Sequence, residues 1–97
     1  MQMTQPAVLD EKVKRYETLL RRALSAFELT PQDKSHLRKV ADDFSTMAQA
    51  YYDDGRFFYE QGDKVNALAC FSYGHAWLDA GVKLGVFKVS DENLFTI

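Results

Sequence analysis

Apolar residues recur at helical spacing along most of the chain, and this periodicity limits the fold more than any other feature. Between Leu9 and Phe27 they follow one another at intervals of three or four residues, which aligns them on one face of a helix. A second stripe of the same kind runs from Leu37 to Phe58. From Ala67 onward, apolar side chains point in almost every direction around a third helix, which predicts that this helix is the most buried. The pattern indicates an all-α fold.

Two short breaks divide these stripes. At Thr30-Pro31 a hydroxyl can cap free backbone N–H groups, and proline suits the first position of a helix. At Gly62-Asp63 glycine can end one helix and aspartate can cap the next. We therefore predict helices over about 8–27, 31–61 and 64–86. They should form a three-helix up-and-down bundle with a long central helix, and a short tail over 88–97 should pack back onto it.

Length and composition fit one small domain. A chain of 97 residues hides roughly 60 to 65% of its unfolded surface, enough for one core, so we expect a single domain over 1–97. The longest apolar run, Ala67 to Phe71, is far shorter than a membrane span, and the N-terminus lacks the apolar centre of a secretion signal. Cys70 is the only cysteine, which excludes an intrachain disulfide. We expect a cytoplasmic protein without a membrane partner.

Small and aromatic residues alternate across the second and third predicted helices as they do in a tetratricopeptide helix hairpin. One such unit cannot bury its own apolar faces, so the first helix must serve as its neighbour and no repeat array is expected. The residues with this spacing are Tyr51, Gly55, Phe58, Gly62, Ala67 and Phe71.

The most distinctive strings are AYYDDGRFF at 50–58 and YGHAWLDAG at 73–81, together with Leu84-Gly85 and the tail residues Leu94 and Phe95. With these strings the chain resembles a short archaeal family known only as domain of unknown function 357. The resemblance runs from the first helix to the tail and is densest from 51 to 87. It implies a small, all-helical, up-and-down bundle in an archaeal cytoplasm. It implies no established activity, substrate or catalytic residue.

Ser72, His75 and Asp79 form the most chemical-looking group, because their spacing places them along one stripe of the third helix. A small hydrolase would need these groups to converge on an oxyanion pocket, which one regular helix does not supply. A row of polar side chains at a contact between helices is the better interpretation of these three residues. A metal site would need further ligands from the second helix, where the candidates are Asp53, Asp54 and Glu60. No nucleotide-binding glycine loop is present, and we expect no cofactor.

The first predicted helix carries a basic face that could contact phosphates, formed by Lys14, Arg15, Arg21 and Arg22. Glu11 and Glu17 are interspersed with these cations, and no aromatic side chain lies among them to stack on bases. The net charge of −2 also argues against a dedicated nucleic-acid binder. RNA binding through this face is therefore the alternative function.

Aromatic side chains are too numerous for a three-helix bundle to bury them all. Neighbouring rings such as Phe57 and Phe58 point about 100° apart on a helix, so some must remain at the surface. Exposed aromatic residues dominate the binding energy of interfaces. We therefore predict a protein-interaction or assembly module without catalytic activity, acting as a homodimer or with a protein partner. The predicted contact residues are Tyr52, Phe57, Tyr73 and Trp77.

Overall fold

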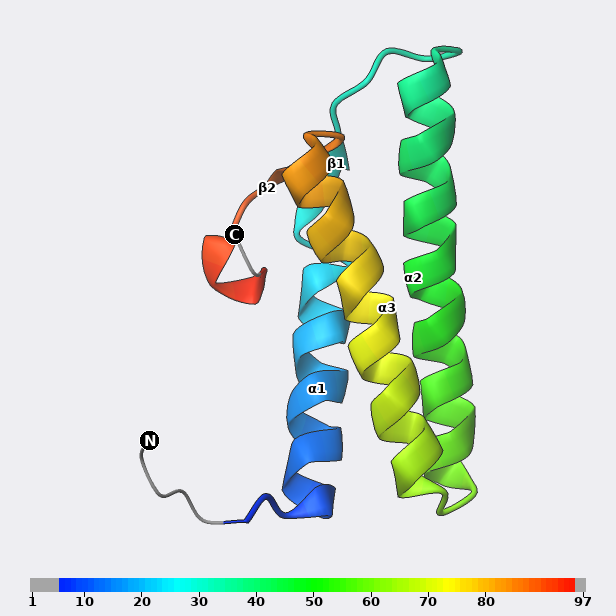
Figure 1. Ribbon diagram of the computed structural model, residues 1–97, viewed down its shortest axis with the longest axis vertical. Helices are drawn as coiled ribbons and strands as arrows, with labels where there is room; N and C mark the ends of the chain where they lie inside the picture. Colours follow the sequence, from blue (N-terminus) through cyan, green and yellow to red (C-terminus); the bar gives the residue numbers. More distant parts are fainter. Residues whose placement is uncertain (1–5, 96–97) are drawn as a thin grey trace.

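The computed structural model describes residues 6–95 and confirms the all-α, three-helix architecture (Figure 1). Helix α1 spans Leu9–Ala23, α2 spans His36–Glu60 and α3 spans Lys64–Leu84. The long helix predicted at the centre of the sequence is α2, with 25 residues. Two short strands, β1 (Phe27–Leu29) and β2 (Phe87–Val89), pair antiparallel, and a 3₁₀ turn, η1 (Glu92–Leu94), closes the described chain.

Helix α3 is the spatial centre of the molecule. It packs against both α1 and α2, whereas α1 and α2 barely touch each other (Figure 1). The result is a flat molecule with extents of 45 × 35 × 19 Å between Cα atoms. Because the shortest extent is so small, α3 buries the side that faces its two neighbours and leaves its opposite side uncovered.

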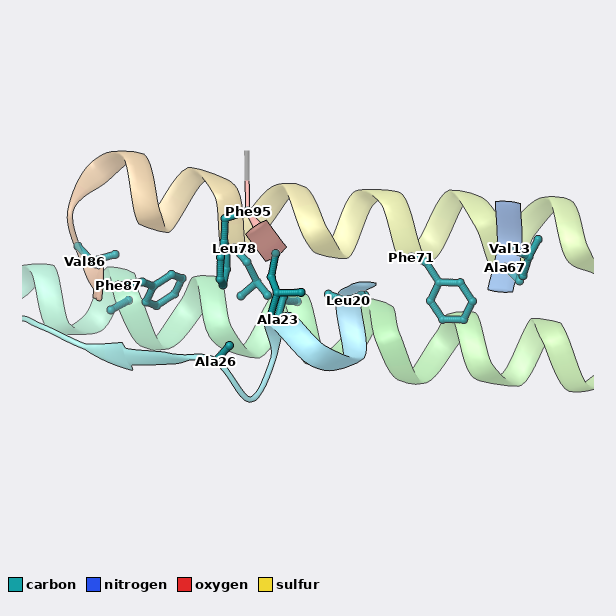
Figure 2. Packing of buried hydrophobic residues seen from close by; sticks show 13 residues of the cluster. Val13, Leu20, Ala23, Ala26, Ala67, Phe71, Leu78, Val86, Phe87 and Phe95 are labelled. Carbon is teal, nitrogen blue, oxygen red and sulfur yellow. The ribbon is translucent and has the colours of Figure 1, made fainter. Parts of the chain in front are cut away.

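Two glycines let α2 and α3 approach closely. A Cβ atom at Gly55 would lie 2.5 Å from Cε1 of Phe71, whose ring is fully buried and points from α3 toward α2 (Figure 2). A Cβ atom at Gly74 would lie 2.9 Å from Leu20 and 3.0 Å from Tyr51. The predicted alternation of small and aromatic residues therefore packs α2 closely against α3. The buried apolar residues around these contacts are Val13, Leu20, Ala23, Ala41, Ala48, Ala67, Phe71 and Leu78.

The predicted end of the first helix at residue 27 is wrong, because α1 stops at Ala23 and residues 27–29 form β1. Phe27 continues the apolar spacing of the helix, so periodicity alone could not reveal the break. Its ring packs instead on Phe87, with 4.4 Å between the ring centroids. Pairing with β2 supplies the backbone hydrogen bonds that a further helical turn would have made.

The predicted start of the second helix at residue 31 is also wrong. Helix α2 begins at His36, and the hydroxyl of Ser35 caps it by accepting a 3.0 Å hydrogen bond from the backbone N–H of Arg38. The hydroxyl of Thr30, expected to be the cap, donates to the carbonyl of Gly85 at 2.7 Å. Lys34 has a positive φ of 66°, which no helical turn allows.

The C-terminal segment packs back onto the bundle as predicted. Helix α3 ends at Leu84, two residues before the expected boundary, and Gly85 follows in the left-handed conformation with φ of 87°. The chain then returns along the helices and buries Phe87, Leu94 and Phe95. The last two residues of the predicted tail, 96–97, lie outside the described residues.

Replacing Gly55 with alanine tests the close contact of α2 and α3. Alanine is about 1 kcal/mol better than glycine inside a helix, yet we expect Gly55→Ala to lower the free energy of unfolding by about 1–3 kcal/mol, because the buried Phe71 ring occupies the space of the new methyl group. Urea denaturation monitored by circular dichroism measures the change. In a Phe71→Leu background the same substitution should cost much less. An equal change in the free energy of unfolding in both backgrounds would contradict the contact.

Candidate functional site

His75 is buried, with 7% of its surface exposed, and both nitrogens of its ring are engaged. Nε2 lies 2.6 Å from the carbonyl oxygen of Leu94, and Nδ1 lies 3.1 Å from a carboxylate oxygen of Asp79. The ring also packs near Phe95, with 6.1 Å between the ring centroids. Each ring nitrogen therefore lies within hydrogen-bond distance of an oxygen atom. His75 therefore clamps the C-terminal segment to α3.

The predicted polar group is only partly assembled. His75 and Asp79 meet as expected, but Ser72 is exposed, and both nitrogens of the His75 ring are already bonded to other groups. The imidazole therefore has no free nitrogen with which to activate the Ser72 hydroxyl. The arrangement in this structure positions a segment of chain and does not form a nucleophile and its base.

The acidic residues that could have completed a metal site lie elsewhere. Asp53 accepts a 3.0 Å hydrogen bond from the side chain of Gln49, and Glu60 pairs with Arg56 at 3.3 Å, both on the surface of α2. Among residues 6–95, no three His, Cys, Asp or Glu side chains are grouped closely enough to hold a metal ion.

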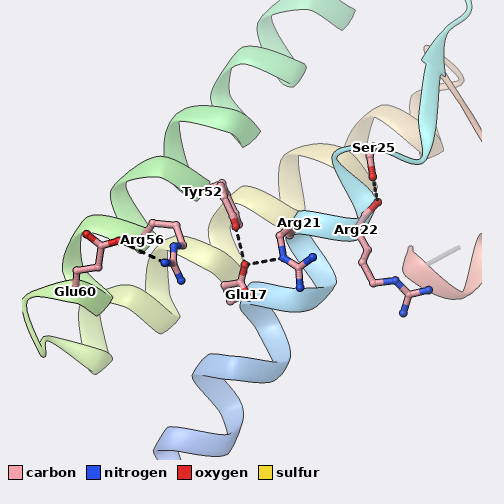
Figure 3. A network of polar contacts seen from close by, with 7 residues as sticks. All are labelled: Glu17, Arg21, Arg22, Ser25, Tyr52, Arg56 and Glu60. Atoms are coloured by element: carbon pink, nitrogen blue, oxygen red, sulfur yellow. Dashed lines mark hydrogen bonds and ion pairs between the residues drawn. The ribbon is translucent and has the colours of Figure 1, made fainter.

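Tyr52 lies between α1 and α2 and not on an open surface. Its hydroxyl donates to the carboxylate of Glu17 at 2.6 Å, and the same carboxylate oxygen accepts from Arg21 at 3.1 Å (Figure 3). Burial and the neighbouring Glu17 raise the pKa of Tyr52 to about 12. Because α1 and α2 have few other contacts, this junction is a main polar link between them.

The cations of the predicted basic face stand beside carboxylates. Lys14 pairs with Asp10 at 3.2 Å, Arg21 pairs with Glu17, and Arg22 lies 4.0 Å from Asp91. The pairs of Lys14 and Arg22 are exposed at the surface, so their contributions to stability are small. Pairing nonetheless reduces the positive field that a phosphate backbone would meet.

Asp10 on α1 pairs with a second cation besides Lys14. Lys64 of α3 reaches Asp10 at 2.9 Å, and together Lys64 and Lys14 lower the pKa of the Asp10 carboxyl. Of the four predicted phosphate contacts, Arg15 is exposed and enters no ion pair among the described residues. Nucleic-acid binding through this face stays a prediction.

The four predicted interface aromatics do not share one face. Tyr52 belongs to the junction of α1 and α2, and Phe57, 59% exposed, packs on Phe58. Tyr73, 54% exposed, and Trp77 lie one turn apart on α3, where their ring centroids are 6.3 Å apart. Tyr73 also packs edge-on against Tyr51 of α2 at 4.6 Å. Only Tyr73 and Trp77 therefore sit together.

Helix α3 has an uncovered apolar face that was not predicted from the sequence. Helical spacing aligns its members on the side opposite the buried residues of the helix, and all of them are exposed. Val65 is 66% and Leu84 is 53% exposed. A hollow of about 210 Å³ adjoins the face, lined by Tyr51, Ala69, Cys70 and Tyr73. We call this surface the α3 outer face and define it as Val65, Ala69, Tyr73, Ala76, Ala80 and Leu84.

The prediction that α3 is the most buried helix is confirmed, because α3 has six buried residues and α1 and α2 have three each. Apolar residues in every direction around an axis are typical of a helix that is covered on every side. Residues 6–95 cover α3 on one side only. The same pattern was the available signal for an uncovered apolar side of α3.

Comparisons with known proteins agree with the fold. The model of a family described as "Protein of unknown function (DUF357)" matches residues 15–87. A crystal structure of a protein from Archaeoglobus fulgidus with the same family model is similar, with a TM-score of 0.63 and 24% identity. The match covers 87% of this chain and 100% of that one. At this identity the likeness shows a shared fold. No curated protein matches the chain.

None of the helices within residues 6–95 combines the length and apolar character needed to cross a membrane.

Removing the His75 ring should release the C-terminal segment. We expect His75→Phe to lower the free energy of unfolding by about 1–3 kcal/mol, because it leaves the buried Leu94 carbonyl without its donor. The same substitution at His36, which is exposed at the start of α2, is the matched control and should change stability little. Urea denaturation and limited proteolysis after residue 90 measure the two effects. Equal losses of stability and equal cleavage in the two variants would contradict the role of His75 as a clamp.

The Tyr52 junction predicts a loss of stability in alkali. A pKa raised from 10.0 to about 12 in the folded state means that the contribution is present below pH 10 and is lost as pH rises toward 12. The unfolding free energy of the wild type should therefore fall more steeply across this range than that of Tyr52→Phe. Lysines titrate alike in both proteins, so the difference isolates Tyr52. Parallel curves would show that the junction does not form.

Proposed function

The chain belongs to the DUF357 family of proteins of unknown function, and we propose that it acts as a protein-docking module that binds its partner through the α3 outer face. The observation that carries the proposal is a continuous apolar stripe on the exposed side of the central helix. Large exposed apolar patches on soluble proteins mark interaction sites, because water is a poor solvent for them.

The chemistry of the α3 outer face suits a helical partner. Its residues follow intervals of three and four, which is the pattern by which one helix recognises another. Ala69, Ala76 and Ala80 allow a second backbone to approach closely, while Tyr73 and Leu84 provide large apolar side chains. None of the six residues carries a charge, so docking here removes no ion from water.

The adjoining hollow supports docking better than catalysis. Cys70 lines it, and burial together with Asp54 and Asp63 raises the pKa of the thiol. A thiol with a raised pKa stays protonated and is a poor nucleophile. The hollow between Tyr51 and Tyr73 therefore serves best as a recess for an apolar side chain of the partner.

The hydrogen bonds of His75 to Leu94 and Asp79 support this proposal. By holding Leu94 and Phe95 against the flank of α3, His75 keeps the C-terminal segment beside α1. The segment covers that flank of α3 and leaves the α3 outer face free. A rigid neighbour of this kind lowers the entropy lost when a partner docks.

Two matched aromatic variants test the proposal. Tyr73 and Phe57 are exposed to a similar degree, 54% and 59%, but only Tyr73 belongs to the α3 outer face. We expect Tyr73→Ser to reduce specific complex formation by the full chain about tenfold or more. Phe57→Ser should leave it unchanged. Crosslinking in cell extract, with helicity checked by circular dichroism, measures both.

Repeating the crosslinking with added nuclease distinguishes this proposal from nucleic-acid binding. Complexes that survive nuclease and require Tyr73 support the docking surface. Complexes that disappear with nuclease, or that are lost in an Arg21→Glu, Arg22→Glu double variant and kept in Tyr73→Ser, would contradict it. The double variant reverses charges on the far side of the molecule, so it should not disturb an apolar contact on α3.

A further inference from the structure

We propose that a small hollow at the junction of α1 and α2 is a binding site for one phosphate group. The hollow has a volume of about 70 Å³ and is lined by two residues of each helix, Lys14 and Glu17 of α1 and Arg56 and Tyr59 of α2. This volume is roughly twice the 30 Å³ share of one water molecule in the liquid, which leaves room for a tetrahedral oxyanion. None of the four residues belongs to the α3 outer face, so this inference is independent of the proposed function.

The cations that line the hollow supply the donors that a phosphate group needs. The Arg56 guanidinium can hold two phosphate oxygens at once, and the Lys14 ammonium can bind a third. Arg56 lies over the ring of Tyr59, 5.8 Å from its centroid, and this contact orients the guanidinium group. Tyr59 adds a phenol hydroxyl, which can also donate. Donors from both helices therefore surround one small space.

A third cation adjoins the hollow. Burial and Glu17 raise the pKa of Tyr52. The charges of Arg56 and Arg21 oppose this rise, which places both guanidinium groups close to the Tyr52 hydroxyl (Figure 3). Together with Lys14, three cations from two helices therefore meet at this junction.

The carboxylate that lines the hollow is already engaged. One oxygen of Glu17 accepts hydrogen bonds from the Tyr52 hydroxyl at 2.6 Å and from Arg21 at 3.1 Å (Figure 3). The positive charge of Arg21 offsets the negative charge that Glu17 brings to the hollow. Lys14 and Arg56 are therefore the charges that an entering anion meets.

The ion pairs of these two cations are easily exchanged. Lys14 pairs with Asp10 at 3.2 Å and Arg56 pairs with Glu60 at 3.3 Å, and the four side chains are between 41% and 64% exposed. Exposed pairs of this kind are weak, so a phosphate group can displace both carboxylates. Ion pairing reduces the attraction of the cations over long distances, but a bound oxyanion is recognised by donors at contact distance.

Titration of the full chain with inorganic phosphate, followed by heteronuclear NMR at constant ionic strength, tests this inference. We expect saturable shifts of the backbone amides of the four lining residues, which sodium chloride does not produce. Arg56→Gln should weaken binding about tenfold, because it removes the two-pronged donor. Arg15→Gln removes an exposed cation of α1 outside the hollow and should leave binding unchanged. Equal weakening by both variants, or no saturable shift in the wild type, would overturn the site.

A second variant tests the site in the opposite direction. Glu60→Gln releases Arg56 from its ion pair and leaves the lining of the hollow intact, so phosphate binding should tighten about two- to threefold. Glu60 is exposed, and circular dichroism checks that the helicity of the variant is kept. Unchanged or weaker binding in Glu60→Gln would overturn the assignment of Arg56 to the site.

A nucleoside monophosphate in the same titration distinguishes the sources of the phosphate group. Tighter binding than that of inorganic phosphate supports a phosphate ester as the ligand, and equal or weaker binding supports free phosphate. In each case the amides of the four lining residues should shift. Binding that shifts other amides and not these would overturn the site.

Discussion

The architecture depends on one close contact, the entry of the Phe71 ring into the space that Gly55 leaves open on α2. Without a side chain at Gly55 the two helices can lie close enough for Gly74 to meet Leu20 and Tyr51, and α3 then fits between α1 and α2. The strand pair and the C-terminal segment add to this hairpin at one end. Close packing therefore gives a flat molecule with a central helix that is covered on one side only.

The uncovered side of α3 links the fold to the proposed function. No element within residues 6–95 covers it, and the C-terminal segment is held on the α1 flank by His75. Leaving Tyr73 and Leu84 in water costs hydrophobic free energy that docking recovers. The polar groups that looked catalytic in the sequence instead position the chain, because the His75 ring is fully engaged by Asp79 and Leu94.

The fold could be predicted because helical periodicity and the Gly62-Asp63 break are local signals, and α3 begins at the expected residue. The strands could not be predicted, since they are three residues long and Phe27 fits a helical stripe as well as it fits the strand. Thr30 looked like a helix cap because its distant partner, the Gly85 carbonyl, is invisible in the sequence. Of the site, the pairing of His75 with Asp79 followed from spacing on one helix. The placement of Tyr52 against Glu17 depends on how α1 and α2 pack, which spacing does not determine.

The central claim is that the α3 outer face is covered in the working protein, and hydroxyl-radical footprinting of the full chain tests it most directly. Dilute solution, concentrated solution and cell extract are compared, with Phe57 as an internal reference of similar exposure. The account predicts that oxidation of Tyr73 and Leu84 falls severalfold with concentration or in cell extract while oxidation of Phe57 stays constant. Equal oxidation of all three residues at every concentration, and also in cell extract, would contradict it.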